Sequence, residues 1–366
     1  MNAALPADAP LLARRPRRIA VFRALHLGDL LCTVPALRAL RGAAPQAEIT
    51  LIGLPWTQPF TARYRHYLDH WLEYPLGEEL PDDPRHEPRL RDFLGAVRAR
   101  RFDLAIQLHG SGERSNGLVA AFGAARVAGF RPAGAPSADG AAFLPWRDDE
   151  GEIERWLRLL RHLGARGDDV IDLPVQALER CESSLLLAQA GLAGRRYVCI
   201  HAGARLPSRR WPLARFRAVA ARLAAAGYSL ALTGSAAEIA QNNELRNGLR
   251  LPPGIALGDF AGRTSVGALA EIVARAALLV ANDTGISHVA AAVGTPSIII
   301  SSGGDAKRWA PLRRDLHQVL AEAPPCRPCL HVECPYPGHP CATAIDVEAV
   351  LAAARQLLDR GVRHVA

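Results

Sequence analysis

The chain has 366 residues, almost half of them apolar, which is enough for about two domains with sizeable cores. Its formal net charge is +8, and the excess is arginine because Lys307 is the single lysine. The arginines are scattered and match no nucleic-acid-binding motif, so we expect no nucleic-acid partner. No run of about 18 uncharged apolar residues occurs, so no membrane span is predicted.

The first 16 residues do not resemble a secretory signal. Such a signal places its charges before an apolar run, whereas Arg14 and Arg15 follow Leu11 and Leu12. We therefore predict a disordered tail over residues 1–16 and a cytoplasmic location. The basic charge is compatible with peripheral contact with the cytoplasmic face of the inner membrane.

Residues 17–176 alternate short apolar runs with helical patterns. Strands are predicted over 18–23, 49–52, 104–108 and 126–130, and helices over 29–42, 89–100, 113–123 and 152–163. Gly, Asp and Pro then interrupt the pattern between residues 164 and 174, which indicates a domain boundary. We place that boundary after residue 176.

A second series of strands and helices occupies residues 177–345. Strands are predicted over 197–200, 229–232, 278–280 and 297–300, and helices over 177–190, 213–226, 236–249, 266–276 and 286–293. A last helix within residues 346–366 could pack back onto the first domain. This alternation predicts an α/β fold with two Rossmann-like domains, whose parallel sheets face a central cleft and bind ligands at their carboxyl edges.

The first predicted strand leads into a short loop and then a helix, with Gly28 and Asp29 at the junction. Gly28 permits a tight turn there. A carboxylate at the start of a helix stays ionised and can accept a proton from an alcohol. The alternative is that Asp29 only caps the helix.

Three further junctions between strand and helix carry polar or small residues. In one, Gly203 follows a strand, and Arg209 and Arg210 precede a helix that begins near Pro212. These arginines either neutralise a pyrophosphate or belong to a solvated basic loop. In another, Gly234 makes a small turn before Glu238, which either accepts from ribose hydroxyls or supplies a favourable charge in the first helical turn.

The third junction runs from Asn282 to His288. The first turn of the following helix exposes unpaired N–H groups and a partial positive charge, which suit a phosphate. Thr284 and Gly285 are small enough to let an anion approach the backbone. The alternative is an ordinary Asp or Thr N-cap on a core helix.

Seven cysteines occur, and four of them lie close together in the order C-x2-C-x4-C-x6-C. These are Cys326, Cys329, Cys334 and Cys341. They could hold a structural zinc or iron ion, although the spacing is not that of a standard zinc finger. The alternative is a set of reduced thiols in a proline-rich loop, as an odd cysteine count in a cytoplasmic chain suggests.

Several of these motifs, in their order along the chain, resemble glycosyltransferase family 9, the lipopolysaccharide heptosyltransferases, and the cysteine-rich loop is similar to that of heptosyltransferase II-like members. The motifs are Gly28 to Arg38 (GDLLCTVPALR), Arg209 to Pro212 (RRWP), Gly234-Ser235 with Glu238, Ala261 to Ser265 (AGRTS), Asn282 to His288 (NDTGISH), Arg308 to Pro311 (RWAP), and Cys326 to Cys341. The resemblance spans residues 17 to 360.

The resemblance implies a GT-B fold with an acceptor-binding first domain and a donor-binding second domain. It implies inverting transfer of a heptose from an ADP-activated donor to a glycan or glycolipid, with Asp29 as the catalytic base. By the same resemblance, Thr284 and Gly285 hold the donor phosphates, Asp283 and His288 belong to that motif, and Glu238 lies near the ribose. The family usually has lysine where this chain has Arg209, so the contact of Arg209 with the diphosphate differs in geometry.

We accordingly expect catalytic roles for Asp29 and Arg209. The residues expected to bind the donor are Gly28, Gly203, Arg210, Gly234, Glu238, Asp283, Thr284, Gly285 and His288. No cofactor is expected to be required, because Asp-x-Asp, the common metal–diphosphate signature, is absent from the sequence.

Two other kinds of function remain open. One is a transferase or epimerase that uses another nucleotide sugar on the same fold, and the other is a non-catalytic nucleotide-sugar-binding protein. A dehydrogenase is disfavoured because no G-x-G-x-x-G follows the first strand.

Overall fold

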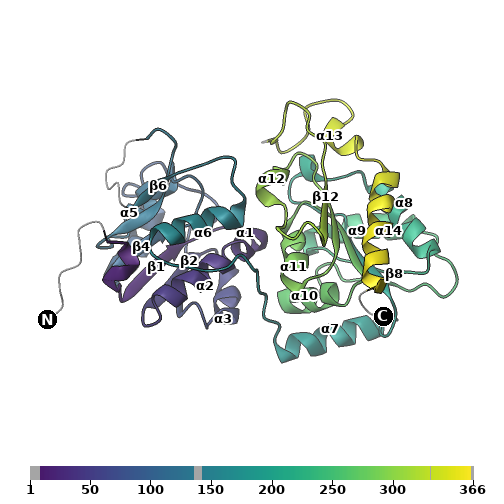
Figure 1. The fold of residues 1–366 in the computed structure, drawn as a ribbon, viewed down its shortest axis with the longest axis horizontal. Coiled ribbons are helices and arrows are strands. Elements are labelled where there is room, and N and C mark those ends of the chain that lie inside the picture. Colours follow the sequence, from purple (N-terminus) through teal and green to yellow (C-terminus); the bar gives the residue numbers. More distant parts are fainter. Residues whose placement is uncertain (1–8, 136–141, 330, 364–366) are drawn as a thin grey trace. The chain divides into compact units, whose positions relative to one another are not determined.

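A computed structural model of the chain describes residues 9–135, 142–329 and 331–363. Contacts divide the chain into two units, Met1–Val170 and Ile171–Ala366, slightly before the boundary predicted at residue 176. Each unit contains one six-stranded sheet with helices packed against it (Figure 1).

All strand pairs of the first sheet are parallel, in the order β3-β2-β1-β4-β5-β6. Its strands are β1 (Arg18–Phe22), β2 (Glu48–Gly53), β3 (His70–Glu73), β4 (Leu104–Gln107), β5 (Val127–Arg131) and β6 (Phe143–Pro145). The strand order reverses between β1 and β4. Ligands of such sheets bind where the order reverses, beyond the carboxyl ends of the strands.

The second sheet repeats this topology, with the order β12-β11-β10-β7-β8-β9 and parallel pairing throughout. Its strands are β7 (Tyr197–His201), β8 (Ser229–Leu232), β9 (Leu257–Asp259), β10 (Leu278–Asn282), β11 (Ser297–Ile300) and β12 (His317–Leu320). Here the order reverses between β7 and β10. The predicted α/β class with two Rossmann-like parallel sheets is confirmed.

The four helices predicted for the first unit are observed, one of them as two helices, and one further α-helix, Thr57–Arg63, was not predicted. The helices of this unit are η1 (Leu11–Arg14), α1 (Leu27–Leu31), α2 (Val34–Ala43), α3 (Thr57–Arg63), η2 (Pro88–Leu90), α4 (Arg91–Ala99), α5 (Ser115–Ala120) and α6 (Glu152–His162). The helix predicted over 29–42 is two helices, α1 and α2. Pro35 near the start of α2 lacks the N–H that would continue the hydrogen-bond ladder of α1.

The predicted disordered tail is wrong from Leu11 onward. Leu11 and Leu12 are buried in η1, and the Leu12 N–H donates to Leu163 O at 3.0 Å. Burial of two leucines offsets the entropy of ordering this short segment. Residues 1–8 of the predicted tail lie outside the described residues.

The second unit contains α7 (Ala177–Gln189), η3 (Pro207–Arg209), α8 (Leu213–Ala225), η4 (Ala236–Glu238), α9 (Ile239–Asn247), α10 (Val266–Ala274), α11 (Gly285–Val293), α12 (Ala306–Trp309), α13 (Pro340–Thr343) and α14 (Val347–Arg363). The helix predicted over 236–249 is thus η4 followed by α9. Helix α14 packs beside α8 and against β10 and β11 (Figure 1). Its Val350, Leu351 and Leu357 belong to the core of the second unit, so the prediction that this helix packs onto the first domain is wrong.

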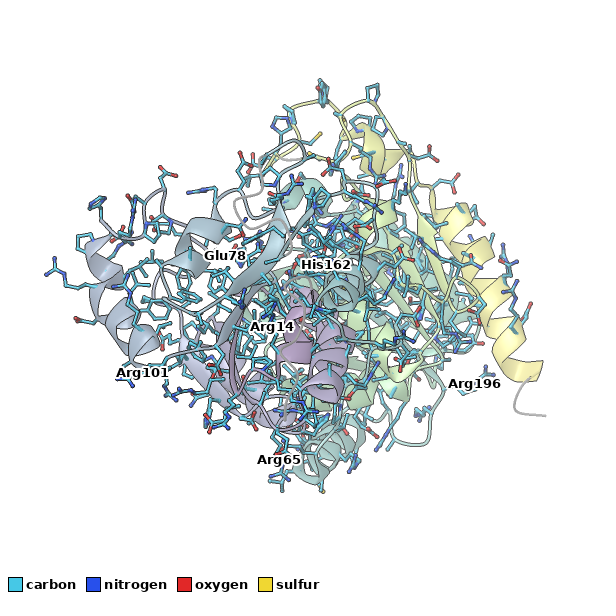
Figure 2. All side chains as sticks on the ribbon, turned by 60° about the vertical axis from the view of Figure 1, so that its left-hand side comes forward. Arg14, Arg65, Glu78, Arg101, His162 and Arg196 are labelled. Carbon is cyan, nitrogen blue, oxygen red and sulfur yellow. The ribbon has the colours of Figure 1, made fainter. Side chains whose placement is uncertain are left out.

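Buried apolar strands form the centre of each unit. Ile19 to Phe22 of β1 are at most 1% exposed, as are Ile298 to Ile300 of β11. The exposed Arg65, Arg101 and Arg196 lie on separate segments (Figure 2). None of the helices in the described part of the chain is long and apolar enough to cross a membrane.

Candidate active site

Asp29 lies at the carboxyl edge of the first sheet, in the first turn of α1. The N-cap of α1 is His26, so the alternative that Asp29 caps this helix is wrong. Gly28, expected in a tight turn, is buried inside α1 instead. The Asp29 side chain is 23% exposed, which leaves the carboxylate accessible to a hydroxyl group.

A buried arginine, which the sequence patterns did not reveal as a site residue, lies directly behind Asp29. Arg23 follows β1 and is 1% exposed. Its Nη2 donates to Asp29 O at 2.9 Å and lies 3.6 Å from Asp29 Oδ1, and its Nη1 donates to Leu108 O at 2.6 Å. The sequence pattern that could have identified Arg23 is a charged residue directly after the four apolar residues of a predicted buried strand.

Glu152 at the start of α6 completes a buried charge network in the first unit. Its Oε1 accepts from Arg23 Nη2 at 3.0 Å, and its Oε2 accepts from Arg155 Nη1 at 2.8 Å. The Arg23 guanidinium also lies over the Trp156 ring, 4.7 Å from its centroid. Charges buried this deeply are tolerated when they are paired, and each charge of this network has an ion-pair partner, although Arg23 Nε has no hydrogen-bond partner.

His109 follows β4 and borders the same network. Burial, and to a lesser extent the charge of Arg23, lowers the pKa of His109 to about 3. The neutral ring accepts the Ala24 N–H at Nδ1, at 3.3 Å, and stacks on Phe22 with 5.1 Å between ring centroids. His109 therefore stays uncharged beside Arg23 at neutral pH.

In the second unit a neutral amide joins the strand ends where the sheet order reverses. Asn282 ends β10 and is fully buried. Its Nδ2 donates to Ala202 O at 2.7 Å and to Gly203 O at 3.3 Å, and its Oδ1 accepts the Trp211 N–H at 2.9 Å. Asn282 thus holds the loop after β7 against the end of β10.

The predicted phosphate site lies at the start of α11. Thr284 is the N-cap, but its side chain makes no capping hydrogen bond. Its Oγ1 is buried and has no hydrogen-bond partner. The next residue, Gly285, is partly exposed and opens the first turn of the helix. A small residue, a hydroxyl without a partner and a helix N-terminus together suit an anion.

Asp283 directly precedes Thr284 and accepts from Ser301 Oγ at 3.0 Å. Burial raises its pKa, while His288, the Ser301 hydrogen bond, Arg209 and Arg327 act in the opposite direction. A Cβ at Gly304 would collide with Asp283 Oδ2 and lie 3.3 Å from Arg209 Nη1, so both groups approach one point.

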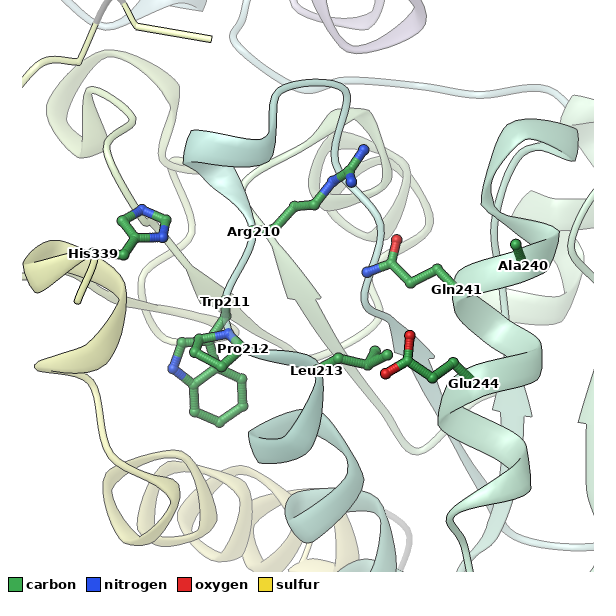
Figure 3. A pocket seen from close by; sticks show the side chains of 8 residues that line it. All are labelled: Arg210, Trp211, Pro212, Leu213, Ala240, Gln241, Glu244 and His339. Carbon is green, nitrogen blue, oxygen red and sulfur yellow. The ribbon is translucent and has the colours of Figure 1, made fainter. Parts of the chain in front are cut away.

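The two adjacent arginines of the predicted phosphate site have different contacts. Arg209 ends η3, and its Nη2 donates to Cys329 O at 3.3 Å. Arg210 instead donates from Nε to Ala204 O at 2.8 Å. It lines a hollow of about 450 Å³ that faces α9, together with Gln241, Glu244 and His339 (Figure 3). Arg209 therefore belongs with Asp283 near the start of α11, and Arg210 belongs to a neighbouring hollow.

Glu238 lies in a second cluster of predicted residues. Its Oε2 accepts the Ser235 N–H at 2.6 Å and the Ser235 hydroxyl at 2.9 Å, so the carboxylate caps η4. A Cβ at Gly203 would collide with Glu238 Oε1, and a Cβ at Gly234 would lie 3.2 Å from Glu238 Cβ. Glycine is therefore required at position 203, because any side chain there would collide with the Glu238 carboxylate.

The cysteine-rich loop, residues 326–341, attaches to both turns around Arg209 and Asp283. Arg327 donates from Nη2 to Ser301 Oγ at 3.1 Å, and the Cys329 N–H donates to Gly303 O at 2.8 Å. The Ser208 N–H donates to Val332 O at 3.0 Å. The loop thus fastens the turn before α8 to the turn after β11.

The four cysteines of this loop are thiols. Cys329 and Cys341 are buried, and burial raises the pKa of Cys341. Within the described residues, no three His, Cys, Asp or Glu side chains gather in an arrangement that could hold a metal ion. A structural metal in this loop stays a prediction.

Comparisons with known proteins show the family and the fold of this chain. The family model of glycosyltransferase family 9 (heptosyltransferase) matches residues 90–339. Lipopolysaccharide heptosyltransferase 2 of Escherichia coli (strain K12) is 26% identical over 307 residues, which cover 77% of this chain and 82% of the relative.

Two solved structures match almost the whole chain. E. coli ADP-heptose lps heptosyltransferase II has a TM-score of 0.71 at 21% identity, covering 96% of this chain and 100% of that one. E. coli heptosyltransferase WaaC with ADP-2-deoxy-2-fluoro heptose has a TM-score of 0.61 at 18% identity, covering 93% and 99%. These matches confirm the GT-B fold that the resemblance implied. The chain belongs to glycosyltransferase family 9, the heptosyltransferase family, and is a glycosyltransferase.

Proposed function

We propose that this chain transfers a heptose from an ADP-activated donor to a hydroxyl group of lipopolysaccharide core, with inversion at the anomeric carbon. The observation that carries the proposal is the start of α11, where Thr284 Oγ1 has no partner beside the helix N-terminus. The sugar and acceptor are supported by the named activity of the E. coli relative. The nucleotide is supported by the ADP-sugar analogue in the WaaC structure.

On the donor side, transfer requires stabilisation of the leaving ADP. Negative charge grows on the diphosphate as its bond to the anomeric carbon breaks. The guanidinium of Arg209 and the backbone N–H groups at the start of α11 stabilise this negative charge, so that no metal ion is needed. Glu238 accepts from the ribose hydroxyls through its remaining lone pairs, and Gly203, Gly234 and Gly285 leave room for the nucleotide.

On the acceptor side, Asp29 acts as the general base. The acceptor oxygen forms a bond to the anomeric carbon while the bond from that carbon to the diphosphate oxygen breaks. The acceptor proton passes to the Asp29 carboxylate, and the electron pair of the broken bond leaves with ADP. Attack from the face opposite the leaving group inverts the anomeric configuration.

Peripheral association with the inner membrane belongs to the same proposal. A core acceptor is anchored in lipid, and a net charge of +8 attracts the chain to an anionic surface. Co-sedimentation with anionic vesicles that weakens at high salt is the expected result, and equal binding to neutral vesicles would contradict it.

Ligand-induced shifts in melting temperature, combined with product analysis, test the main proposal. We expect ADP to raise the melting temperature more than UDP or GDP, because a ligand that binds only the folded state stabilises it.

With ADP-heptose as donor and heptose-deficient core as acceptor, NMR of the product should show one new glycosidic linkage whose anomeric configuration is opposite to that of the donor. The same product should form in the presence of EDTA. A larger shift with UDP or GDP would indicate another nucleotide sugar. An altered sugar without acceptor would indicate an epimerase, and binding without turnover would indicate a non-catalytic protein.

A further inference from the structure

No step of the transfer uses the buried charge network behind Asp29 directly, and Arg23 is the member of that network that contacts Asp29. Arg23 is 1% exposed, although its guanidinium carries a positive charge. Burial of such a charge is unfavourable unless its donors are paired. The role of this buried charge can therefore be inferred from the groups that Arg23 contacts.

Three contacts fix the plane of the Arg23 guanidinium inside the first unit. Nη1 donates to Leu108 O at 2.6 Å, just after β4. Nη2 donates to Glu152 Oε1 at 3.0 Å, and the guanidinium carbon lies 4.7 Å from the Trp156 ring centroid. Groups from a strand end and from α6 thus hold the charge in one orientation.

The fixed guanidinium engages Asp29 at two points. Nη2 donates to the Asp29 carbonyl oxygen at 2.9 Å, which holds the first turn of α1. The same Nη2 lies 3.6 Å from Asp29 Oδ1, which attracts the carboxylate toward the buried charge. Asp29 remains 23% exposed, so a substrate can reach the carboxylate while the cation behind it stays shielded from water.

We propose that Arg23 is the positioning residue of Asp29: it holds both the backbone and the carboxylate of Asp29 in the orientation that receives the acceptor proton. This role rests on Asp29 being the general base of the proposed function. A positioned base accelerates proton transfer by its geometry. Arg23 is accordingly expected to affect turnover more than substrate binding.

Arg155 provides a matched control for a role limited to core stability. It is also fully buried and also binds Glu152, through Nη1 to Oε2 at 2.8 Å. Its guanidinium lies 3.8 Å from the Trp146 ring centroid, and its Nη2 donates to Arg147 O and Glu150 O. Loss of either arginine therefore removes a buried ion pair with the same glutamate.

A double-mutant cycle in the full chain tests the proposal. We expect Arg23→Gln to lower kcat about 10–100-fold, part of the effect of a general base, with KM for the ADP-sugar within about threefold. Arg23→Lys should recover part of the loss. In the Asp29→Asn background, Arg23→Gln should change the residual turnover by less than about threefold, because a group that acts through Asp29 has nothing left to position. Arg155→Gln should lower the melting temperature comparably while changing kcat only a few-fold.

Two results would overturn the positioning role. One is a cycle in which the losses of Arg23→Gln and Asp29→Asn multiply, and the other is a loss of kcat in Arg155→Gln equal to that in Arg23→Gln. If Arg23→Gln does not fold, Arg23→Lys is compared with Arg155→Lys, and equal kcat values for these two variants reject the role. Full turnover in Asp29→Asn alone would reject Asp29 as the base, and is distinguishable because it involves no change at Arg23.

Discussion

The two units share one strand order but join their strand ends in different ways. In the first, the charged Arg23 links the end of β1 to residues after β4 and to α6. In the second, the neutral Asn282 links the end of β10 to the loop after β7. A buried cation needs an anion close by, so the first unit can present a carboxylate at this edge. In the second unit the link is neutral, and the positive N-terminal end of α11 lies next to it, where an anion can bind.

Removal of the carboxylate is expected to have the largest effect. Asp29→Asn should lower kcat about 10²–10⁴-fold, the usual contribution of a general base. The melting-temperature shift with ADP should be retained, because the predicted phosphate-binding residues belong to the second unit. Rapid-quench kinetics and ADP titration measure the two quantities, and a comparable loss of ADP binding would remove the distinction between the units.

Separate changes to the two adjacent arginines sharpen the assignment within the second unit. Arg209→Ala should weaken ADP binding about 10–100-fold, the range for one hydrogen bond to a charged group. Arg210→Ala should cost less, because Arg210 binds Ala204 O and lines the neighbouring hollow. Isothermal titration with ADP and with adenosine separates diphosphate from base contacts. Equal losses for both variants would show that the arginines act together after all.

The neutral link itself is expected to affect stability. Asn282→Ala removes the partners of the buried Trp211 N–H and Ala202 O, and should lower the free energy of unfolding by about 2 kcal/mol. The matched control is Asn247→Ala at the exposed end of α9, which should change the free energy of unfolding by less than about 0.5 kcal/mol. Urea denaturation measures both. Equal stabilities would mean that Asn282 contributes no net stability at this edge.

Each unit also carries a buried neutral histidine, which predicts a smaller, pH-dependent effect. Burial is the main cause that lowers the pKa of His109 to about 3 and of His317 to about 4. The unfolded state then binds more protons between these values and about pH 6.5, so stability falls as the pH falls through that window. At about pH 5.5 each histidine should contribute roughly 1 kcal/mol of this loss.

Matched variants in the two units measure that effect. His109→Gln retains an acceptor for the Ala24 N–H but does not titrate, so its stability should fall less steeply between pH 7 and pH 5.5 than that of the native chain. His317→Gln, which alters the partner of Ser297 Oγ in the second unit, should show a similar flattening. Urea denaturation at both pH values measures the slopes, and unchanged slopes would show that these histidines titrate normally in the folded chain.

The central strands were predictable because burial on both faces leaves continuous apolar runs. The predicted bounds of Ser229–Leu232 and Ser297–Ile300 are those observed. The four edge strands β3, β6, β9 and β12 were missed. They have three or four residues each, and β3 and β9 include polar or charged side chains such as His70 and Asp259, so no long apolar run distinguishes these strands from loops.

The site was predictable where its chemistry lies in one contiguous segment. Asp283, Thr284, Gly285 and His288 fall within the single motif that was identified, and the structure brings Arg209 to the same turn. Arg23 could not be assigned a role, because its partner Glu152 lies 129 residues away in the sequence. The different directions of Arg209 and Arg210 also depend on contacts with residues distant in sequence, such as Cys329.

The sequence by itself determined the two α/β units and the junctions between strand and helix that carry polar residues, because hydrophobic periodicity and turn chemistry are local properties. Only the tertiary structure decided that Arg23 lies behind Asp29, that Arg210 lines a hollow beside α9, and that α14 packs within the second unit. These outcomes depend on pairing of buried charges and on packing between distant segments. Such interactions form only when the sheets have brought those segments together.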